Sequence, residues 1–233
     1  MNQEQLTKIF AAGMPQVLAQ HLAEQVLPRL SEAWIAPADA VIHAVGMQYA
    51  CAPQPEYYAV LLASAMNPKR GNKIHPAFPV LLSQITAQEC RLLQRMQQAE
   101  VAVLDCVMCT VRKPTGGFLQ REPEIATVVR ELIPRLTAWT PEGGDLIGLQ
   151  VCFDNLLRLG LIEIHRNDTV EKPAAVEQER YENIYLLHEA LIQQTWEDAL
   201  QNNPYGSKLE LRLRTGRFTL SAMGRRFVRF CLE

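Results

Sequence analysis

The stretch LLASAMNPKRGNKIHPAF (61–78) brings hydroxyl, amide, basic and imidazole side chains into one short segment. Arg70 and Lys73 lie on either side of a Gly71–Asn72 turn, and a turn flanked by two cations suits a phosphate group. A histidine follows two residues later and offers a group that can transfer protons near neutral pH. These residues define a candidate polar joint: Ser64, Asn67, Arg70, Lys73 and His75.

A structural explanation of the same residues is the one we favour. Asn67 and His75 can satisfy carbonyl groups at the end of a helix over 55–66, and the two cations suit the negative end of the helix dipole. No Asp or Glu occurs between 57 and 88, so no carboxylate lies near His75 in the sequence. We therefore expect His75 to lie within hydrogen-bonding reach of backbone or of Asn67.

Cys106 and Cys109 form a CxxC spacing, which zinc sites and redox sites both use. A structural zinc needs four ligands, and no second CxxC or HxxxH pair follows. The surroundings of most cysteines are apolar, so we expect small core residues, with no metal and no cofactor. The six cysteines are Cys51, Cys90, Cys106, Cys109, Cys152 and Cys231.

Motifs of the common enzyme classes are absent from the sequence. It contains no GxSxG, HExxH, P-loop or GxGxxG, and its five histidines have no signature spacing to any cysteine. We therefore do not expect an enzyme, and a hydrolase or other enzyme is the least favoured alternative.

Charge is unevenly distributed along the chain. Residues 203–233 hold seven basic and two acidic residues, a net charge of +5, which leaves −7 for the other 202 residues of a chain whose total is −2. Such asymmetry predicts a basic face toward a protein partner or nucleic acid. Its candidate residues are Arg212, Arg214, Arg217, Arg225, Arg226 and Arg229.

The elements that must position these residues are predicted from caps and periodicity. The first 54 residues have helical periodicity. A helix over 55–66 begins at Pro55, and a capping box of Thr86 and Glu89 starts another over 87–98. β-Branched residues predict a strand over 100–113. Residues 124–139 are expected to be helical with a break at Pro134.

The C-terminal half continues with a helix over 145–159 that ends at Gly160, and a strand over 161–165. A helix over 177–201 and two strands, 208–214 and 217–220, follow, before a last helix capped by Ser221. Gly224 would let this last helix approach the strand closely. This order predicts a helix-rich α+β fold in which N-terminal helices (1–54) precede a winged-helix-like domain (55–233) with a long insertion in the wing (about 166–216). The strands at 161–165 and 217–220 should pair.

Four segments, LLASAMNPKRGNKIHPAF, LSQITAQE, DNLLRLGLIEI and FTLSAMGRRFVRFC, resemble the abortive-infection alpha (Abi-alpha) domain family over residues 55–231. The resemblance implies a bacterial protein associated with phage defence, and it supplies no catalytic residues.

Two functions stay open. The helix over 145–159 carries Asp145, Asp154 and Arg158, a net charge of −1, and only Gln150, Asn155 and Arg158 could contact bases. We therefore expect a non-enzymatic, cytoplasmic protein-interaction module. Its partner is another protein or a second copy of itself, which would give a homo-oligomer. A winged-helix DNA-binding transcriptional regulator is the alternative.

No apolar run reaches the ~18 residues that span a bilayer, and no signal peptide is evident.

Overall fold

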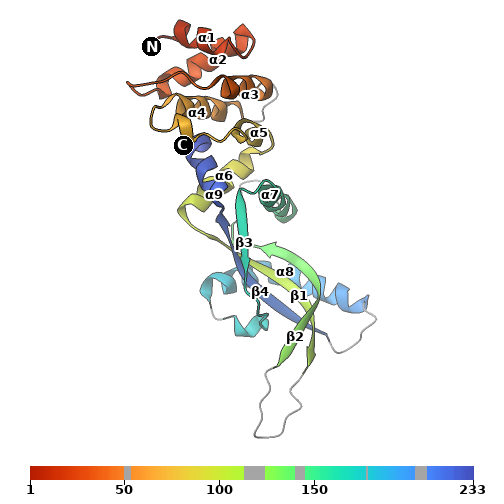
Figure 1. Ribbon diagram of the computed structural model, residues 1–233. Helices are drawn as coiled ribbons and strands as arrows, with labels where there is room; N and C mark the ends of the chain where they lie inside the picture. Colours follow the sequence, from red (N-terminus) through yellow and green to blue (C-terminus); the bar gives the residue numbers. More distant parts are fainter. Residues whose placement is uncertain (50–53, 113–123, 140–144, 177, 203–208) are drawn as a thin grey trace. The chain divides into compact units, whose positions relative to one another are not determined.

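The computed structural model describes residues 1–49, 54–112, 124–139, 145–176, 178–202 and 209–233 (Figure 1). These pack into two compact units. The helical unit combines Met1–Ala99, Cys152–Ile162 and Leu220–Glu233, and the sheet unit combines Glu100–Val151 and Glu163–Thr219. The boundaries of these units do not coincide with residue 54, where the sequence analysis placed a domain boundary. That the segments 1–54 and 55–233 are separate domains stays a prediction.

The helical unit is built from short helices around an aromatic core. Its side chains of Phe10, Tyr58, Phe78, Phe153 and Phe227 are fully buried. The Phe78 and Phe227 rings meet edge to face, with centroids 5.5 Å apart. Its elements are α1 (Gln3–Phe10), α2 (Gln16–Val26), η1 (Leu27–Arg29), α3 (Asp39–Tyr49), α4 (Pro55–Met66), η2 (Gly71–Lys73), α5 (Phe78–Ser83), α6 (Ala87–Gln98), the second part of α7 (Leu146–Arg158), α9 (Ala222–Phe227) and the π-helical turn η5 (Val228–Leu232).

Local signals placed several helix ends correctly. α4 begins at Pro55 and ends before Asn67. The capping box of α6 is formed, since the Glu89 N–H donates to Thr86 Oγ1 and the Thr86 N–H donates to Glu89 Oε2 at 2.6 Å. Each reciprocal bond satisfies a backbone donor that the helix itself leaves unpaired.

Gly160 ends α7 and is hydrogen-bonded to the start of the last helix. Its φ of 67° lies in the left-handed region, and the Leu161 N–H donates back to Leu156 O at 3.0 Å. Ser221 caps α9 as predicted, because its hydroxyl accepts from the Gly224 N–H at 2.9 Å. The same hydroxyl donates to Gly160 O, so the cap also connects the two helices.

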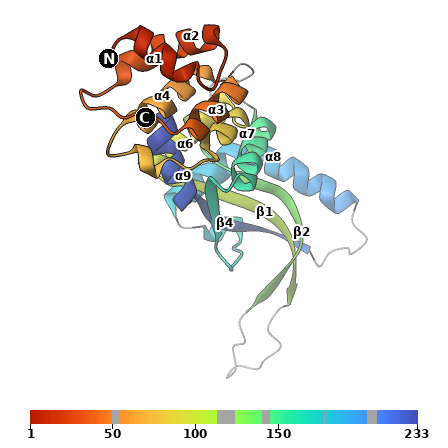
Figure 2. The ribbon, with the colours of Figure 1, turned by 45° about the horizontal axis from the view of Figure 1, so that its top comes forward.

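The sheet unit contains a four-stranded antiparallel sheet in the order β2-β1-β4-β3, with bounds β1 (Val101–Arg112), β2 (Ile125–Leu136), β3 (Ile162–Arg166) and β4 (Leu209–Leu220). β3 lies next to β4, which confirms the expected pairing of 161–165 with 217–220. The long helix α8 (Glu179–Gln201) packs on the sheet through Tyr181, Ile184 and Ile192 (Figure 2). A short turn, η3 (Pro173–Ala175), precedes α8.

The prediction of a helix over 124–139 is wrong, because this segment forms β2. Its β-branched residues suit a strand, and it pairs with β1 from Arg112↔Ile125 to Leu104↔Leu136. Pro134 falls where this register is irregular, next to Arg135 with φ 57°. A bulge tolerates a residue without an N–H, so the proline interrupts the ladder without ending the strand.

The prediction of two separate strands at 208–214 and 217–220 is also wrong, because these residues form the single strand β4. Thr215 and Gly216 look like a turn locally, yet they pair with Leu104 and Val103 of β1. Twelve residues of β4 thus continue through the expected break. The long partner strand provides backbone bonds that outweigh the weak local turn preference.

Candidate functional site

The polar joint is organised by Asn67 at the end of α4. The Asn67 side-chain oxygen accepts from the Lys69 N–H at 2.9 Å. Its backbone oxygen accepts from the N–H groups of Arg70 and Gly71 at 3.0 and 2.8 Å. Asn67 therefore has a structural role in the turn that follows the helix, but its side chain bonds to an N–H group and not, as expected, to a carbonyl at the helix end.

His75 lies in a second turn, just before α5. Its Nδ1 accepts a hydrogen bond from the Ala77 N–H at 3.2 Å, so it is within reach of backbone as expected. The imidazole ring also lies 5.7 Å from the Phe78 ring, centroid to centroid. These contacts use the histidine to shape the entrance to α5.

A small cavity brings together only part of the joint. Ser64, Asn67 and Arg70 line it with Arg29 and Glu233, whereas Lys73 and His75 do not. Its volume is about 140 Å³, below the ~300 Å³ at which small-molecule sites begin. The candidate phosphate-binding residues therefore do not all line this cavity, and the structural explanation stays the one we favour.

The six arginines of the candidate basic face divide between the units, and those of the sheet unit are neutralised locally. Arg212 is 5% exposed and forms ion pairs with Glu124 and Glu210. Arg217 lies 3.5 Å from Glu100, and Arg214 joins the network described below. The charges of these three guanidinium groups are therefore paired with carboxylates, although the pair of Arg217 and Glu100 is about half exposed.

The three arginines of the helical unit stay exposed and bond to neutral groups. Arg225 donates to Leu220 O and Arg226 donates to Lys73 O, both at 2.6 Å. Arg229 lies over the Phe230 ring, 5.8 Å from its centroid. No carboxylate of the described chain forms an ion pair with them, so their positive charge faces solvent. We call Arg225, Arg226 and Arg229 the arginine trio.

A buried charge network crosses the sheet, with one residue from each strand. Asp105 of β1 is 1% exposed. Its Oδ2 accepts from Arg166 of β3 at 2.6 Å and from Arg214 of β4 at 2.9 Å. Glu131 of β2 lies 3.6 and 3.4 Å from the same two arginines.

Asp105 also holds the irregular part of β2, because its Oδ1 accepts from the Arg135 N–H at 2.9 Å. The two carboxylates and two guanidinium groups balance in charge. Sequence reasoning missed this network, although one signal was present: Asp105 is a lone acid inside the apolar run VAVLDCVMC. A buried carboxylate requires partners of opposite charge.

The described cysteines are buried free thiols. Burial raises the pKa of Cys90 and of Cys106 to about 12, and that of Cys152 to about 11. Burial likewise raises the pKa of Cys109, against the opposing effect of Arg212 and Arg214. In the described part of the chain, no three His, Cys, Asp or Glu side chains gather where a metal ion could bind.

Thiol labelling tests this environment. Cys51 lies outside the described residues, so the experiment uses a Cys51→Ser variant. At pH 8 a thiol with a pKa of about 12 is ionised to roughly one part in ten thousand, and only the thiolate reacts. We expect almost no reaction of the native protein with a disulfide reagent, and reaction of all five thiols after unfolding. Rapid labelling of one native thiol would contradict the expectation.

The same pKa shifts predict how stability depends on pH. Burial holds these thiols protonated in the folded state, whereas the unfolded chain releases their protons near pH 9. Their contribution to stability is therefore complete below about pH 9 and falls as the pH rises above it.

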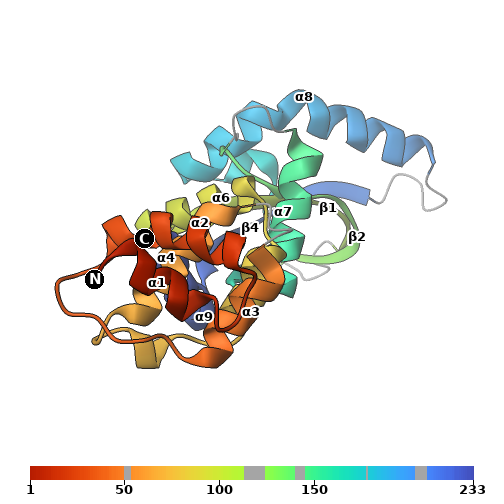
Figure 3. The same ribbon diagram turned by 90° about the horizontal axis from the view of Figure 1, so that it is seen from above.

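α8 carries apolar side chains that the sheet does not cover. Leu187 and Leu191, one helical turn apart, are 55% and 40% exposed. We call this pair the α8 stripe. The helix holds five acidic residues and one basic residue, so it is also strongly acidic. Figure 3 shows α8 as one long uninterrupted helix.

Helices around an aromatic core and an antiparallel sheet packed on one long helix define a helix-rich α+β protein. The model of the family described as abortive infection alpha matches residues 41–231. The chain therefore belongs to the abortive infection alpha family, as the sequence motifs indicated. No curated protein and no solved structure matches it. None of the described helices is long and apolar enough to cross a membrane.

Proposed function

We propose that the chain is a non-enzymatic protein-interaction module that acts in the bacterial defence against phage by associating through the α8 stripe. The exposure of Leu187 and Leu191 on an acidic helix carries this proposal. Exposed leucines that lie one turn apart are the anchors by which helices bind partner surfaces. The family of the chain supplies the context of abortive infection.

The charge around the stripe selects the partner. Five carboxylates against one guanidinium on α8 favour a basic partner surface, since complementary charge steers association. The arginine trio of a second copy is such a surface, because its charges are exposed and, among the described residues, bond to neutral groups. A homo-oligomer is therefore the partner arrangement that we propose.

The proposal includes no catalysis, because the side chains that could react are either protonated by burial or bonded to other groups. The thiols of Cys90, Cys106 and Cys152 are held protonated by burial. His75 is occupied in a turn, and Asp105 in an ion network. Groups in such positions are poor nucleophiles and poor proton-transfer catalysts.

The alternative, a winged-helix DNA-binding regulator, would use α7 as the recognition helix, β3 and β4 as the wing strands and the segment between them as the wing insertion. Each polar side chain of α7 that could contact bases already has a partner within the chain. Gln150 donates to Pro134 O, and Asn155 donates to Glu89 Oε1 at 2.7 Å. Arg158 donates to Asn155 Oδ1 at 2.7 Å. Base contact would require breaking these bonds, so we favour the interaction module.

The test of the interaction module combines two leucine substitutions. Leu187→Gln with Leu191→Gln removes the apolar anchors and leaves the buried face of α8 unchanged. We expect self-association, measured by light scattering, to weaken at least about tenfold, and phage plaquing on cells that carry the variant to rise toward that of cells lacking the protein. The matched control is Leu186→Gln with Leu200→Gln, the same chemical change at exposed positions outside the stripe.

A second variant separates the two functions. Replacing the arginine trio with glutamine should weaken self-association and leave the fold intact, because exposed substitutions usually cost within about 0.5 kcal/mol. If this variant keeps full self-association but loses tight, salt-dependent binding to duplex DNA, the DNA-binding alternative is the better explanation. Equal self-association of wild type and both variants would refute the interaction module.

A further inference from the structure

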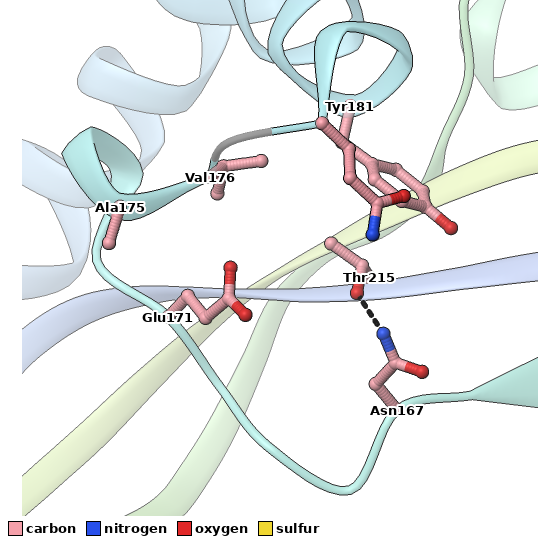
Figure 4. A pocket seen from close by; sticks show the side chains of 7 residues that line it. Asn167, Glu171, Ala175, Val176, Tyr181 and Thr215 are labelled. Carbon is pink, nitrogen blue, oxygen red and sulfur yellow. Dashed lines mark hydrogen bonds between the residues drawn. The ribbon is translucent and has the colours of Figure 1, made fainter.

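A polar cavity lies in the sheet unit between the segment that follows β3 and the start of α8 (Figure 4). Its volume is about 410 Å³, within the range of small-molecule sites. It lies in the stretch that the sequence analysis treated as a wing insertion. The lining residues that matter to its chemistry are Asn167, Glu171, Val176, Gln178, Tyr181 and Thr215.

Backbone bonds to β4 hold one wall of the cavity. The Asn167 N–H donates to Thr215 O at 2.9 Å. Glu171 and Leu213 exchange both of their backbone hydrogen bonds at 2.8 Å. These bonds fix the main chain on which Asn167 and Glu171 are carried, so the polar side chains start from a preformed frame.

The core holds the other wall. Val176 and Tyr181 belong to the buried cluster that joins α8 to the sheet. The Tyr181 hydroxyl donates to Gly216 O at 3.1 Å. A cavity whose walls are parts of the core loses little conformational entropy when it binds a ligand.

The Glu171 carboxylate is the unused charge of this cavity. Figure 4 shows it beside Val176 and Thr215, on the inner side of the loop. It forms no hydrogen bond or ion pair with another described residue, whereas the Asn167 amide donates to the Thr215 hydroxyl.

The cations that line the space adjoining this cavity are already engaged. An adjoining space of about 230 Å³ is lined by Arg180 and Arg217, and it shares Asn167, Gln178 and Tyr181 with the first. Arg217 pairs with Glu100 at 3.5 Å. Arg180 donates to Gln178 Oε1 and lies over the Tyr181 ring, 4.8 Å from its centroid. Neither pairs with Glu171, so the carboxylate can accept a cation from outside.

We infer that this cavity binds an organic cation, a guanidinium or primary ammonium group, through the Glu171 carboxylate. A cation with several N–H donors can bond to both oxygens of the carboxylate, and charge-assisted bonds of this kind are about twice as strong as neutral ones. The group comes from a free amine or from a basic side chain of a peptide. This inference does not depend on the α8 stripe.

Calorimetry on the full chain distinguishes these sources with two probes. Agmatine represents a free guanidinium compound, and acetyl-Gly-Arg-Gly-amide represents a peptide side chain. We expect the wild-type protein to bind at least one probe, with a dissociation constant below about 1 mM. Glu171→Gln should weaken that binding at least about tenfold, because it removes the charge and keeps the shape.

Two further variants keep the test sharp. Glu182→Gln makes the same charge change at an exposed position of α8 outside the cavity lining and should bind as wild type does. Ala175→Phe fills the cavity without a charge change and should also abolish binding. The backbone pair between Glu171 and Leu213 does not involve the substituted side chain, and near-ultraviolet circular dichroism checks that each variant is folded.

Three results would overturn the inference. The first is that neither probe binds the wild-type protein. The second is that Glu171→Gln binds as tightly as wild type, or that Glu182→Gln loses as much affinity. The third is that the dianion succinate binds as tightly as agmatine, since a carboxylate-lined site must repel an anion.

Discussion

Replacing Asp105 with asparagine is expected to remove about 3–5 kcal/mol from the free energy of unfolding of the sheet unit. The substitution keeps the size of the side chain and deletes its charge. Arg166 and Arg214 then lose a carboxylate that is 1% exposed and lies 2.6 and 2.9 Å from them. A buried ion pair that loses one partner leaves an uncompensated charge, which costs far more than a lost surface contact.

Hydrogen exchange of the strands, together with urea unfolding, measures this loss within the sheet unit. Glu131→Gln is the matched control, because Glu131 contacts the same two arginines but is 39% exposed in its side chain. Solvent screens such pairs, so this control should cost at most about 1 kcal/mol. Equal losses for the two variants would show that burial of Asp105 does not determine the energy of the network.

The second large effect is expected from Gly224→Ala in the helical unit. A Cβ at this position would lie 1.8 Å from Leu161 O and 2.9 Å from the Leu161 carbonyl carbon. Both are backbone atoms, so no side chain can rotate away and α9 itself must shift. The shift would weaken the Ser221 cap and the packing of Phe227, which is fully buried. We expect a loss of about 3 kcal/mol, the upper end of the usual range for overpacking, measured by thermal and urea unfolding.

Gly160→Ala provides the comparison for this substitution. It adds the same methyl group where no atom lies within 4 Å, and its only cost is the φ of 67°. That conformation costs a residue with a Cβ roughly 1–2 kcal/mol. A loss at Gly224 no larger than the loss at Gly160 would mean that α9 moves at little cost, and the close approach would then not be a constraint.

Both glycines and their surroundings illustrate what the sequence by itself determined. The capping box at Thr86, the start of α4 at Pro55, the end of α7 at Gly160 and the Ser221 cap were all predicted correctly. Each depends on hydrogen bonds among residues within about one helical turn, so the sequence contains all the partners. The family motifs follow the same segments, which is why the residues alone were enough to indicate the family.

Strand identity and the use of charge were decided only by the tertiary structure. Residues 125–136 have enough helical character to mislead, and they become β2 because β1 offers a long paired edge. The expected basic face was divided because Arg212, Arg214 and Arg217 pair with carboxylates that are far away in the sequence, at Glu124, Asp105 and Glu100. The cavity around Glu171 likewise depends on a loop, a helix start and β4 meeting in space. These partners lie tens of residues apart, and the energy that selects them comes from burial and cross-strand pairing, which no short stretch of sequence contains.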